Sequence, residues 1–263
     1  MLLEGKRLLI TGVLDPRSIA FSVARIAQEQ GAEVLLTGFG RGKRLTERSA
    51  GRLDPVPEVL ELDVTKPEDI TAVAADIDER WGRIDGLLHA IGFAPESCLG
   101  GGFLDAPWED VSVALQVSTY SYVSLGNGFA DLLAKGEDPS IVGLDFDAQI
   151  AWPGYDWMGV AKAGLESANR YLARDLGPRG IRANLIAAGP LSTMAARSID
   201  GFQAFEGVWE DRAPIGWDLT DPSAVARTAC ALMSPWMPGV TGEIIHVDGG
   251  VHAVGAGGRA DSR

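Results

Sequence analysis

Two side chains that can do polar chemistry, Tyr155 and Lys162, are seven positions apart in a helix-forming stretch. Seven residues at about 100° each make roughly two helical turns, so both side chains leave the same face, about 10 Å apart along the axis. One turn after the tyrosine, at the position from which a lysine would lie closest to the phenol, the chain has Gly159. We therefore expect one helix face to present a phenol and, two turns further on, an ammonium.

This spacing favours one of two kinds of chemistry. A lysine one turn away lowers the pKa of a phenol and makes it an acid–base group for alcohols. A lysine two turns away is better placed to hold the ribose of a nucleotide cofactor and leaves Tyr155 as a neutral hydrogen-bond donor. About 13 residues before the tyrosine, Val142 and Gly143 offer no hydroxyl for an alcohol or ketone reaction. The sequence therefore favours the neutral donor.

Strand-length apolar runs alternate with helical patterns along the chain, which predicts an α/β fold: a single Rossmann-type, doubly wound parallel sheet with helices on both faces. The expected strands are 7–11, 33–37, 58–62, 84–91, 141–145, 181–187 and 243–247. The expected helices are 18–30, 67–81, 108–134, 155–176 and 221–233. We expect one domain over 1–254, without internal repeats, and a disordered Gly-rich tail over 255–263.

Two segments are too long to be simple connections. Residues 92–107 contain three consecutive glycines, and residues 190–217 contain an amphipathic piece at 194–209. Both leave the carboxyl ends of predicted strands, where parallel sheets bind their ligands. Long loops at that edge are often functional, so we expect them to form the walls of a pocket, with 190–217 as a substrate loop.

A dinucleotide could bind after the first strand, although the three-glycine fingerprint of that site is absent. Gly12 permits a tight exit from the strand, and Ser18 stands at the expected start of a helix, followed by Ile19. Free N–H groups and the helix dipole at that point could receive a pyrophosphate. Ser18 could equally be only a helix cap.

The second and third strands end in residues that suit an adenosine. Phe39 could stack on the adenine, and Asp63 could accept from its amino group beside the Val64 backbone, or could instead cap the next helix. Position 40 is Gly, without the acid that usually binds the ribose hydroxyls of NAD, and four bases follow that could suit a 2′-phosphate. These bases are Arg41, Lys43, Arg44 and Arg48. The choice between NADH and NADPH stays open.

The fourth strand ends close to the expected cofactor position. Gly92 would allow the backbone to approach the cofactor. His89, three residues earlier, is better explained as a packed core residue than as a catalyst.

Bulk properties exclude several classes of function. The formal charge of −13 over 263 residues argues against a nucleic-acid-binding protein, and no apolar run is long enough to span a membrane. Two cysteines suggest a reducing compartment, so we expect a cytoplasmic location. Cys98 has no nearby His or Cys with which to bind a metal, and Cys230 fits an apolar helix face. We expect no metal site.

Taken in order along the chain, these motifs resemble the enoyl-acyl carrier protein reductases of type II fatty-acid synthesis, a divergent branch of the short-chain dehydrogenases/reductases. The similarity is greatest to their mycobacterial NADH-dependent members and covers residues 2–254. The matching segments are SIAF 18–21, AQEQGA 27–32, LTGF 36–39, LELDV 60–64, IGF 91–93, YSY 120–122, DF 145–146, YDWM 155–158, AAGP 187–190, RAPIGW 212–217 and DGG 248–250.

The resemblance implies a role for each matching residue. Tyr155 would donate to the thioester carbonyl, Lys162 would bond the nicotinamide ribose, and Phe146 would lie beside nicotinamide and substrate. The implied cofactor contacts are Gly12, Ser18, Ile19, Phe39, Asp63, Val64, Ile91, Gly92, Lys162, Leu191 and Thr193. The implied substrate contacts are Tyr155, Phe146 and Met158. The implied cofactor is NADH, with NADPH not excluded.

The implied reaction reduces the trans-2 double bond of an enoyl thioester on acyl carrier protein or coenzyme A, with a homotetramer as the implied assembly. Two positions depart from the mycobacterial pattern: Ala90 replaces a Ser, and Gly40 replaces an Asp. The segment after Thr193 is also shorter, which favours medium-length acyl chains. Two alternatives remain: a short-chain reductase acting on a carbonyl or a specialised enoyl intermediate, and a non-catalytic dinucleotide-binding protein.

Overall fold

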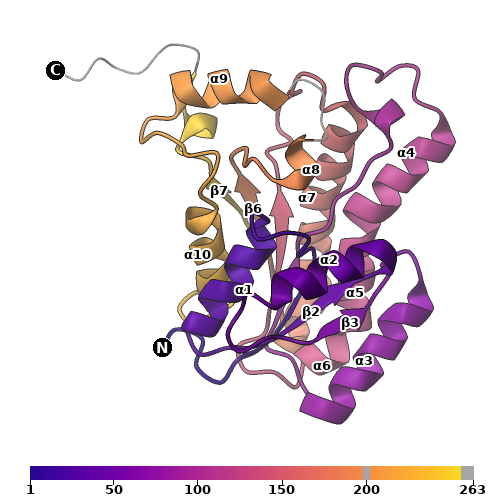
Figure 1. Ribbon diagram of the computed structural model, residues 1–263, viewed down its shortest axis with the longest axis vertical. Coiled ribbons are helices and arrows are strands. Elements are labelled where there is room, and N and C mark those ends of the chain that lie inside the picture. Colours follow the sequence, from indigo (N-terminus) through magenta and orange to yellow (C-terminus); the bar gives the residue numbers. More distant parts are fainter. Residues whose placement is uncertain (198–201, 256–263) are drawn as a thin grey trace.

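Seven parallel strands form one sheet in the order β3-β2-β1-β4-β5-β6-β7 (Figure 1). The computed structural model describes residues 1–197 and 202–255. The strands are β1 Arg7–Ile10, β2 Glu33–Gly38, β3 Val59–Glu61, β4 Gly86–His89, β5 Ser140–Asp145, β6 Arg182–Ala188 and β7 Ile244–Val247. β1 pairs with both β2 and β4, so the order reverses direction between β1 and β4. A ligand crevice is expected at such a reversal.

Helices cover both faces of this sheet. They are α1 Ile19–Glu29, α2 Gly40–Ala50, α3 Pro67–Trp81, α4 Trp108–Leu115, α5 Ser121–Gly128, α6 Ala130–Leu133, α7 Asp156–Leu176, α8 Met194–Arg197, α9 Phe202–Arg212 and α10 Ser223–Leu232. The side chains of α1 and α10 share one apolar core with the sheet, and those of α3, α5 and α7 share the other. The predicted doubly wound Rossmann-type fold is confirmed.

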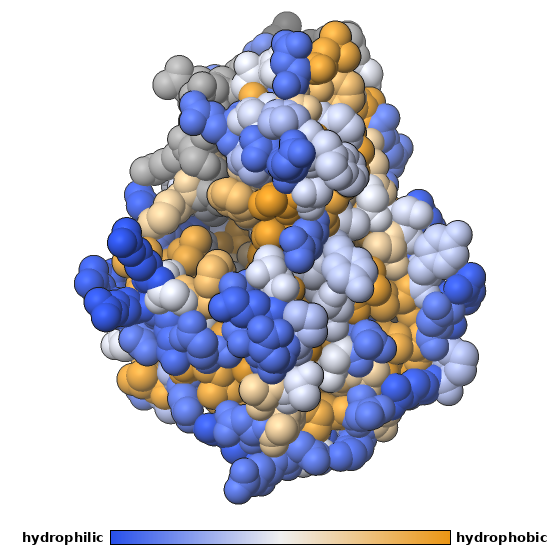
Figure 2. All heavy atoms as spheres, turned by 90° about the vertical axis from the view of Figure 1, so that its right-hand side faces the viewer, coloured by the Kyte–Doolittle hydropathy of each residue, from blue (hydrophilic) through white to orange (hydrophobic). Residues whose placement is uncertain are grey.

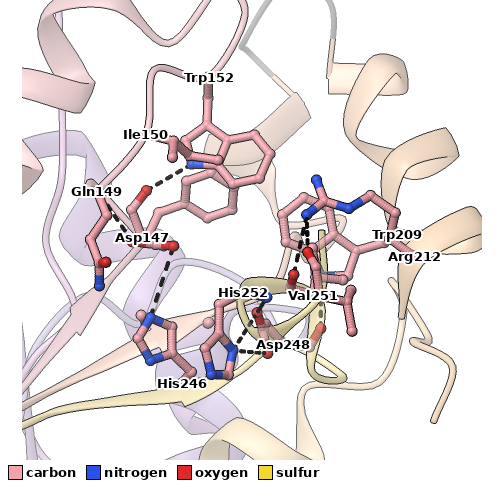
Figure 3. A pocket seen from close by; sticks show the side chains of 14 residues that line it. Asp147, Gln149, Ile150, Trp152, Trp209, Arg212, His246, Asp248, Val251 and His252 are labelled. Carbon is pink, nitrogen blue, oxygen red and sulfur yellow. Dashed lines mark hydrogen bonds and ion pairs between the residues drawn. The ribbon is translucent and has the colours of Figure 1, made fainter. Parts of the chain in front are cut away.

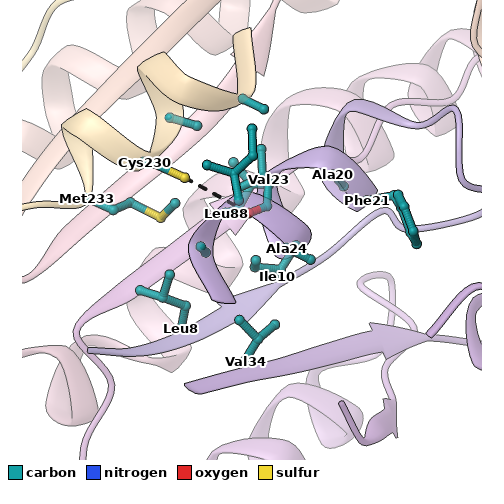
Figure 4. Packing of buried hydrophobic residues seen from close by; sticks show 14 of the residues in the cluster. Leu8, Ile10, Ala20, Phe21, Val23, Ala24, Val34, Leu88, Cys230 and Met233 are labelled. Carbon is teal, nitrogen blue, oxygen red and sulfur yellow. Dashed lines mark hydrogen bonds between the residues drawn. The ribbon is translucent and has the colours of Figure 1, made fainter. Parts of the chain in front are cut away.

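The packing between α1 and α10 holds the first βα unit against the end of the chain (Figure 4). Val23, Ala24 and Cys230 are almost completely buried there with Leu8 and Ile10 of β1. Cys230 is therefore a core residue, as predicted. α1 begins directly after the loop that follows β1, so this core also fixes the start of the expected pyrophosphate site.

The predicted helix over 108–134 is wrong as a single straight element. A π-helical turn, Gln116–Tyr120, interrupts it between α4 and α5. The side chain of Ser118 in this turn bonds both the N–H and the carbonyl of Phe93, at 2.9 Å and 2.8 Å. π-turns occur often at functional sites. Here the turn anchors the loop that leaves β4.

α2 was not foreseen, because Gly40, Gly42 and several bases gave its sequence no clear apolar period. The basic cluster lies on this helix. The other predicted elements are confirmed, with ends displaced by at most two residues. Of the predicted tail, residues 256–263 lie outside the described part of the chain, as do 198–201 of the predicted substrate loop. Along the described ranges, no helix combines the length and apolarity that crossing a membrane requires.

Candidate active site

The predicted site residues gather at one edge of the sheet, where the strands end. Each follows the carboxyl end of a strand or lies on α1 or α7: Gly12, Ser18 and Ile19 after β1, Phe39 after β2, Asp63 and Val64 after β3, Ile91 and Gly92 after β4, Phe146, Tyr155, Met158 and Lys162 after β5, and Leu191 and Thr193 after β6. The surface in Figure 2 is hollowed in its upper half, and apolar residues line the hollow. Residues from six strand ends thus meet at this edge.

Tyr155 and Lys162 share the buried face of α7. Tyr155 occupies the N-cap position, and the buried face continues through Met158 and Lys162 at helical spacing. The exposed fractions of the two side chains are 9% for Tyr155 and 8% for Lys162. The predicted placement of both groups on one helix face is confirmed.

Lys162 extends from α7 back to the end of β5. Its Nζ donates to the carbonyl of Leu144 at 2.8 Å. Burial lowers the pKa of the ammonium, and the carboxylate of Asp145 opposes this shift. An ammonium has three donors, so the bond to Leu144 leaves two for a ligand.

Asp145 is a member of this site to which the sequence assigned no role. Its side chain is 5% exposed, and neither carboxylate oxygen has a hydrogen-bond partner within the described residues. The pKa of Asp145 is raised to about 7, chiefly by burial; the charge of Lys162 opposes this rise and that of Glu166 adds to it. The sequence feature that could have pointed to Asp145 is a charged residue at the end of an otherwise apolar strand. Asp145 supplies the negative charge that faces the buried ammonium.

The phenol of Tyr155 is held by aromatic packing. The ring of Phe146 lies 5.2 Å from the ring of Tyr155 and 5.3 Å from that of Trp152. Burial raises the pKa of Tyr155 above its ordinary value, and the Asp145 charge adds to the shift. No group in the described ranges forms a hydrogen bond with the Tyr155 hydroxyl. The side chain is therefore a neutral phenol whose donor is available to a ligand.

The turn after β1 brings two strand ends unusually close. Gly12 has a φ of +81°, and a Cβ there would lie 2.0 Å from the Ala90 carbonyl oxygen. Only glycine fits this turn. Ser18 then caps α1 by accepting from the N–H of Phe21 at 3.2 Å. In the described structure, the N–H groups of Ile19 and Ala20 have no acceptor, as a pyrophosphate site requires.

The residues after β2 and β3 leave room for an adenosine. Phe39 is 53% exposed, so its ring is available for stacking. The carboxylate of Asp63 accepts from the N–H and the hydroxyl of Thr65, at 3.0 Å and 2.7 Å, while Lys66 is the N-cap of α3. Asp63 thus shapes the turn and does not cap the helix. Val64 is buried beside this turn.

His89 is a core residue, as predicted. It is completely buried, and its Nε2 lies 2.7 Å from the Ser121 hydroxyl. Burial lowers the pKa of His89 to about 3, so the ring is neutral. Within the described residues, a Cβ added at Gly92 would have one neighbour in contact range, Ser118 Oγ at 3.9 Å. The backbone at Gly92 is therefore accessible to a cofactor.

The segment after β6 is anchored by two tryptophans. Trp217 donates to the Pro190 carbonyl at 2.7 Å, and Trp209 of α9 donates to the Asp248 carbonyl at 2.9 Å. Both rings pack against Gly189, where a Cβ would lie 2.8 Å from each. Leu191 is buried beside this anchor, and Thr193 is half-buried. The anchor holds both ends of the segment and neither tryptophan was predicted.

A cavity of about 250 Å³ lies beyond Phe146, between the end of β5 and β7 (Figure 3). Phe146, Trp152 and Trp209 form its aromatic side. Its polar side contains Asp147, Arg212, His246, Asp248 and His252. The rings of His246 and His252 stack with their centroids 3.8 Å apart. Neither Tyr155 nor Lys162 lines this cavity, which adjoins Tyr155 only through the ring of Phe146.

In the described ranges, no group of three or more His, Cys, Asp or Glu side chains is placed to bind a metal ion. The functional groups at the strand edge are instead a phenol, an ammonium, a carboxylate and backbone N–H groups. Such a set can bind a nucleotide and stabilise negative charge on an oxygen.

Comparison with known proteins agrees with this site. Residues 12–252 match the family described as enoyl-(acyl carrier protein) reductase. The chain is 47% identical over 263 residues to the enoyl-[acyl-carrier-protein] reductase [NADH] of Mycolicibacterium smegmatis, covering 95% of this chain and 97% of the relative. It is 43% identical to the same enzyme of Mycobacterium avium, with 95% and 97% covered. It is 38% identical to that of Aquifex aeolicus, with 99% and 96% covered. The chain therefore belongs to the enoyl-acyl carrier protein reductase family, within the short-chain dehydrogenases/reductases.

Proposed function

We propose that this protein reduces the trans-2 double bond of enoyl thioesters with NADH, as the final reductive step of acyl-chain extension in type II fatty-acid synthesis. The observation that carries the proposal is the unbonded, neutral phenol of Tyr155 on the same buried helix face as the ammonium of Lys162, two turns further on. Relatives across the full chain bear the name of this activity and of this cofactor.

The residues at the strand edge suit a nicotinamide dinucleotide. Gly12, Ser18 and Ile19 would hold the pyrophosphate, because free N–H groups lie at the start of α1. The adenosine would contact Phe39, Asp63 and Val64. The nicotinamide half would contact Ile91, Gly92, Lys162, Leu191 and Thr193. When bound, NADH supplies the hydride that adds to C3 of the enoyl group.

The chain's own groups would stabilise the charge that this addition creates. Negative charge develops on the thioester oxygen, to which the Tyr155 hydroxyl would donate a hydrogen bond, and addition of a proton from solvent at C2 would then give the saturated thioester. Lys162 keeps a donor for the nicotinamide ribose and so orients the cofactor. Phe146 packs against Tyr155 and limits the access of water to the phenol. No base for an alcohol proton is needed, which agrees with Val142 and Gly143 on β5.

The acyl chain would contact Tyr155, Phe146 and Met158, whose side chains pack in one buried cluster. The cavity beyond Phe146 has two carboxylates and two imidazoles, a poor lining for a hydrocarbon chain. We propose acyl carrier protein as the carrier, medium-length chains as substrates, a homotetrameric assembly and a cytoplasmic location.

The test is a direct assay. The purified protein is first shown to bind NADH by fluorescence titration and is then mixed with crotonyl-acyl carrier protein or crotonyl-coenzyme A. We expect absorbance at 340 nm to fall and butyryl thioester to form in equal amount. Protein that binds NADH but reduces neither thioester would refute the proposal.

A further inference from the structure

A carboxylate from β3 occupies the place where the second strand of an NAD site usually supplies one. β2 ends at Gly38, and the next residues, Phe39 and Gly40, provide no acid. Glu61, the last residue of β3, lies beside β2, with Gly38 as its direct partner in the sheet. Its Oε1 accepts from the N–H of Gly40 at 2.9 Å. The side chain therefore brings a negative charge to the start of α2.

The second half of α2 is tied to the loop that follows β1, where the pyrophosphate is expected. The hydroxyls of Thr46 and Ser49 on α2 donate to the carbonyls of Val13 and Leu14, the two residues after Gly12. In Rossmann-type sites the adenosine ribose lies between this loop and the end of the second strand. The Glu61 carboxylate is thus at the position where the 2′-hydroxyl of NADH, or the 2′-phosphate of NADPH, would arrive.

Charges around Glu61 would otherwise favour a phosphate. The Nζ of Lys43 lies 3.5 Å from Glu61 Oε2, and Arg41 is exposed on the same first turn of α2. Together with the helix N-terminus, two bases would attract a dianionic phosphate. Glu61 neutralises Lys43 and adds its own repulsion.

We infer that Glu61 determines the preference of this enzyme for NADH over NADPH. Its carboxylate accepts a hydrogen bond from a ribose hydroxyl and repels a 2′-phosphate. This inference rests on the proposed function, because it requires a nicotinamide dinucleotide at the strand edge. It also explains how a chain with Gly at position 40 and a basic second helix can use NADH.

The test measures binding and not turnover. Dissociation constants for NADH and NADPH are determined by fluorescence titration for the wild type, Glu61→Gln and Glu58→Gln. Glutamine keeps an oxygen that can accept from Gly40, so the cap of α2 survives while the charge is lost. Glu58 is a matched control: it is exposed, is ion-paired with Arg80 and lies three residues, about 10 Å, before Glu61.

We expect the wild type to prefer NADH by about tenfold or more. Glu61→Gln should bind NADPH about tenfold more tightly and NADH a few-fold more weakly, whereas Glu58→Gln should bind both as the wild type does. Adding Lys43→Met to Glu61→Gln should remove the gain for NADPH, because the base released from Glu61 is then absent.

An unchanged NADH-to-NADPH ratio in Glu61→Gln, with the thermal unfolding of the wild type, would overturn the inference and reduce Glu61 to a helix cap. A wild type that prefers NADPH would also overturn it. A wild type that binds neither nucleotide would overturn the proposed function together with it. These three outcomes are distinct: the first compares the ratio of dissociation constants in Glu61→Gln with that in the wild type, the second depends on the wild-type ratio, and the third on whether the wild type binds at all.

Discussion

Replacing Lys162 with methionine separates cofactor binding from folding. Methionine has a similar length and no charge, so it fills the same space on the buried face of α7. The change removes the hydrogen bond from Nζ to the Leu144 carbonyl, 2.8 Å long, and the two donors left for a ribose. It also removes the desolvation cost of a buried ammonium, whose pKa is lowered by burial.

The expected loss of affinity follows from the lost hydrogen bonds. A bond from a charged donor contributes about 1.5–3 kcal/mol, which corresponds to about 10- to 150-fold in the dissociation constant for NADH. The stability of the free protein should change less. The unpaired Leu144 carbonyl costs about 1–3 kcal/mol, but the lost desolvation penalty of the ammonium offsets it.

The assay is a fluorescence titration with NADH, accompanied by thermal unfolding with and without the nucleotide. Lys135→Met serves as the control, because Lys135 is exposed, pairs with Asp78 and lies outside the site. We expect the control to bind NADH like the wild type. The temperature shift caused by NADH should shrink in Lys162→Met and persist in Lys135→Met.

Equal affinity for NADH in the wild type and in Lys162→Met would refute the assignment of the ammonium to the ribose. Lys162 would then be a structural lysine that bonds the Leu144 carbonyl near the charge of Asp145. A variant that loses NADH binding only because it is unfolded would be recognised by the absence of a cooperative thermal transition. In that event Lys162→Gln, which keeps a donor for Leu144, gives the same comparison.

The remaining predictions concern three residues. Tyr155→Phe should lower kcat with crotonyl thioester about 10- to 150-fold and leave the NADH dissociation constant unchanged, since one donor to the oxyanion is lost; unchanged turnover would contradict its role. Gly12→Ala should destabilise the fold by at least about 2 kcal/mol in urea and abolish NADH binding, because φ is +81° and the new Cβ would overlap the Ala90 carbonyl; wild-type stability would contradict this. Burial raises the folded pKa of Asp145 from 3.8 to about 7. The protonated carboxyl therefore contributes to the free energy of unfolding fully below pH 4, and this contribution is lost as the pH rises through 7. Asp145→Asn does not titrate, so its melting temperature relative to the wild type should increase from pH 5 to pH 8; a constant difference would argue against the shift.

The groups that were predicted from sequence are those governed by local periodicity. Helical spacing alone placed Tyr155 and Lys162 on one face, and alternating strands and helices placed the loops at one sheet edge. Glu61 and Asp145 could not be assigned roles in this way. The role of Glu61 depends on sheet pairing with β2, and that of Asp145 on how deeply the end of β5 is buried.

The π-turn at 116–120 shows a second reason why sequence reasoning was incomplete. Its residues fit an ordinary helical pattern, and only the tertiary contact between Ser118 and the backbone of Phe93 distinguishes them. Helix type at this position is therefore set by packing against the loop after β4. Single-sequence periodicity has no access to such a contact.

The electrostatics of the site favour a phenol that stays protonated throughout the reaction. A tyrosine that acts as a base needs a nearby cation to lower its pKa, yet here burial and the Asp145 charge both raise the pKa of Tyr155. Lys162 is two turns away and is engaged by Leu144 and Asp145. Because a neutral donor stabilises an enolate without transferring its proton first, kcat should not rise with the ionisation of a phenol between pH 7 and pH 9. This is the behaviour expected for reduction of a carbon–carbon double bond beside a thioester, and it differs from that of an alcohol dehydrogenase, whose base must ionise.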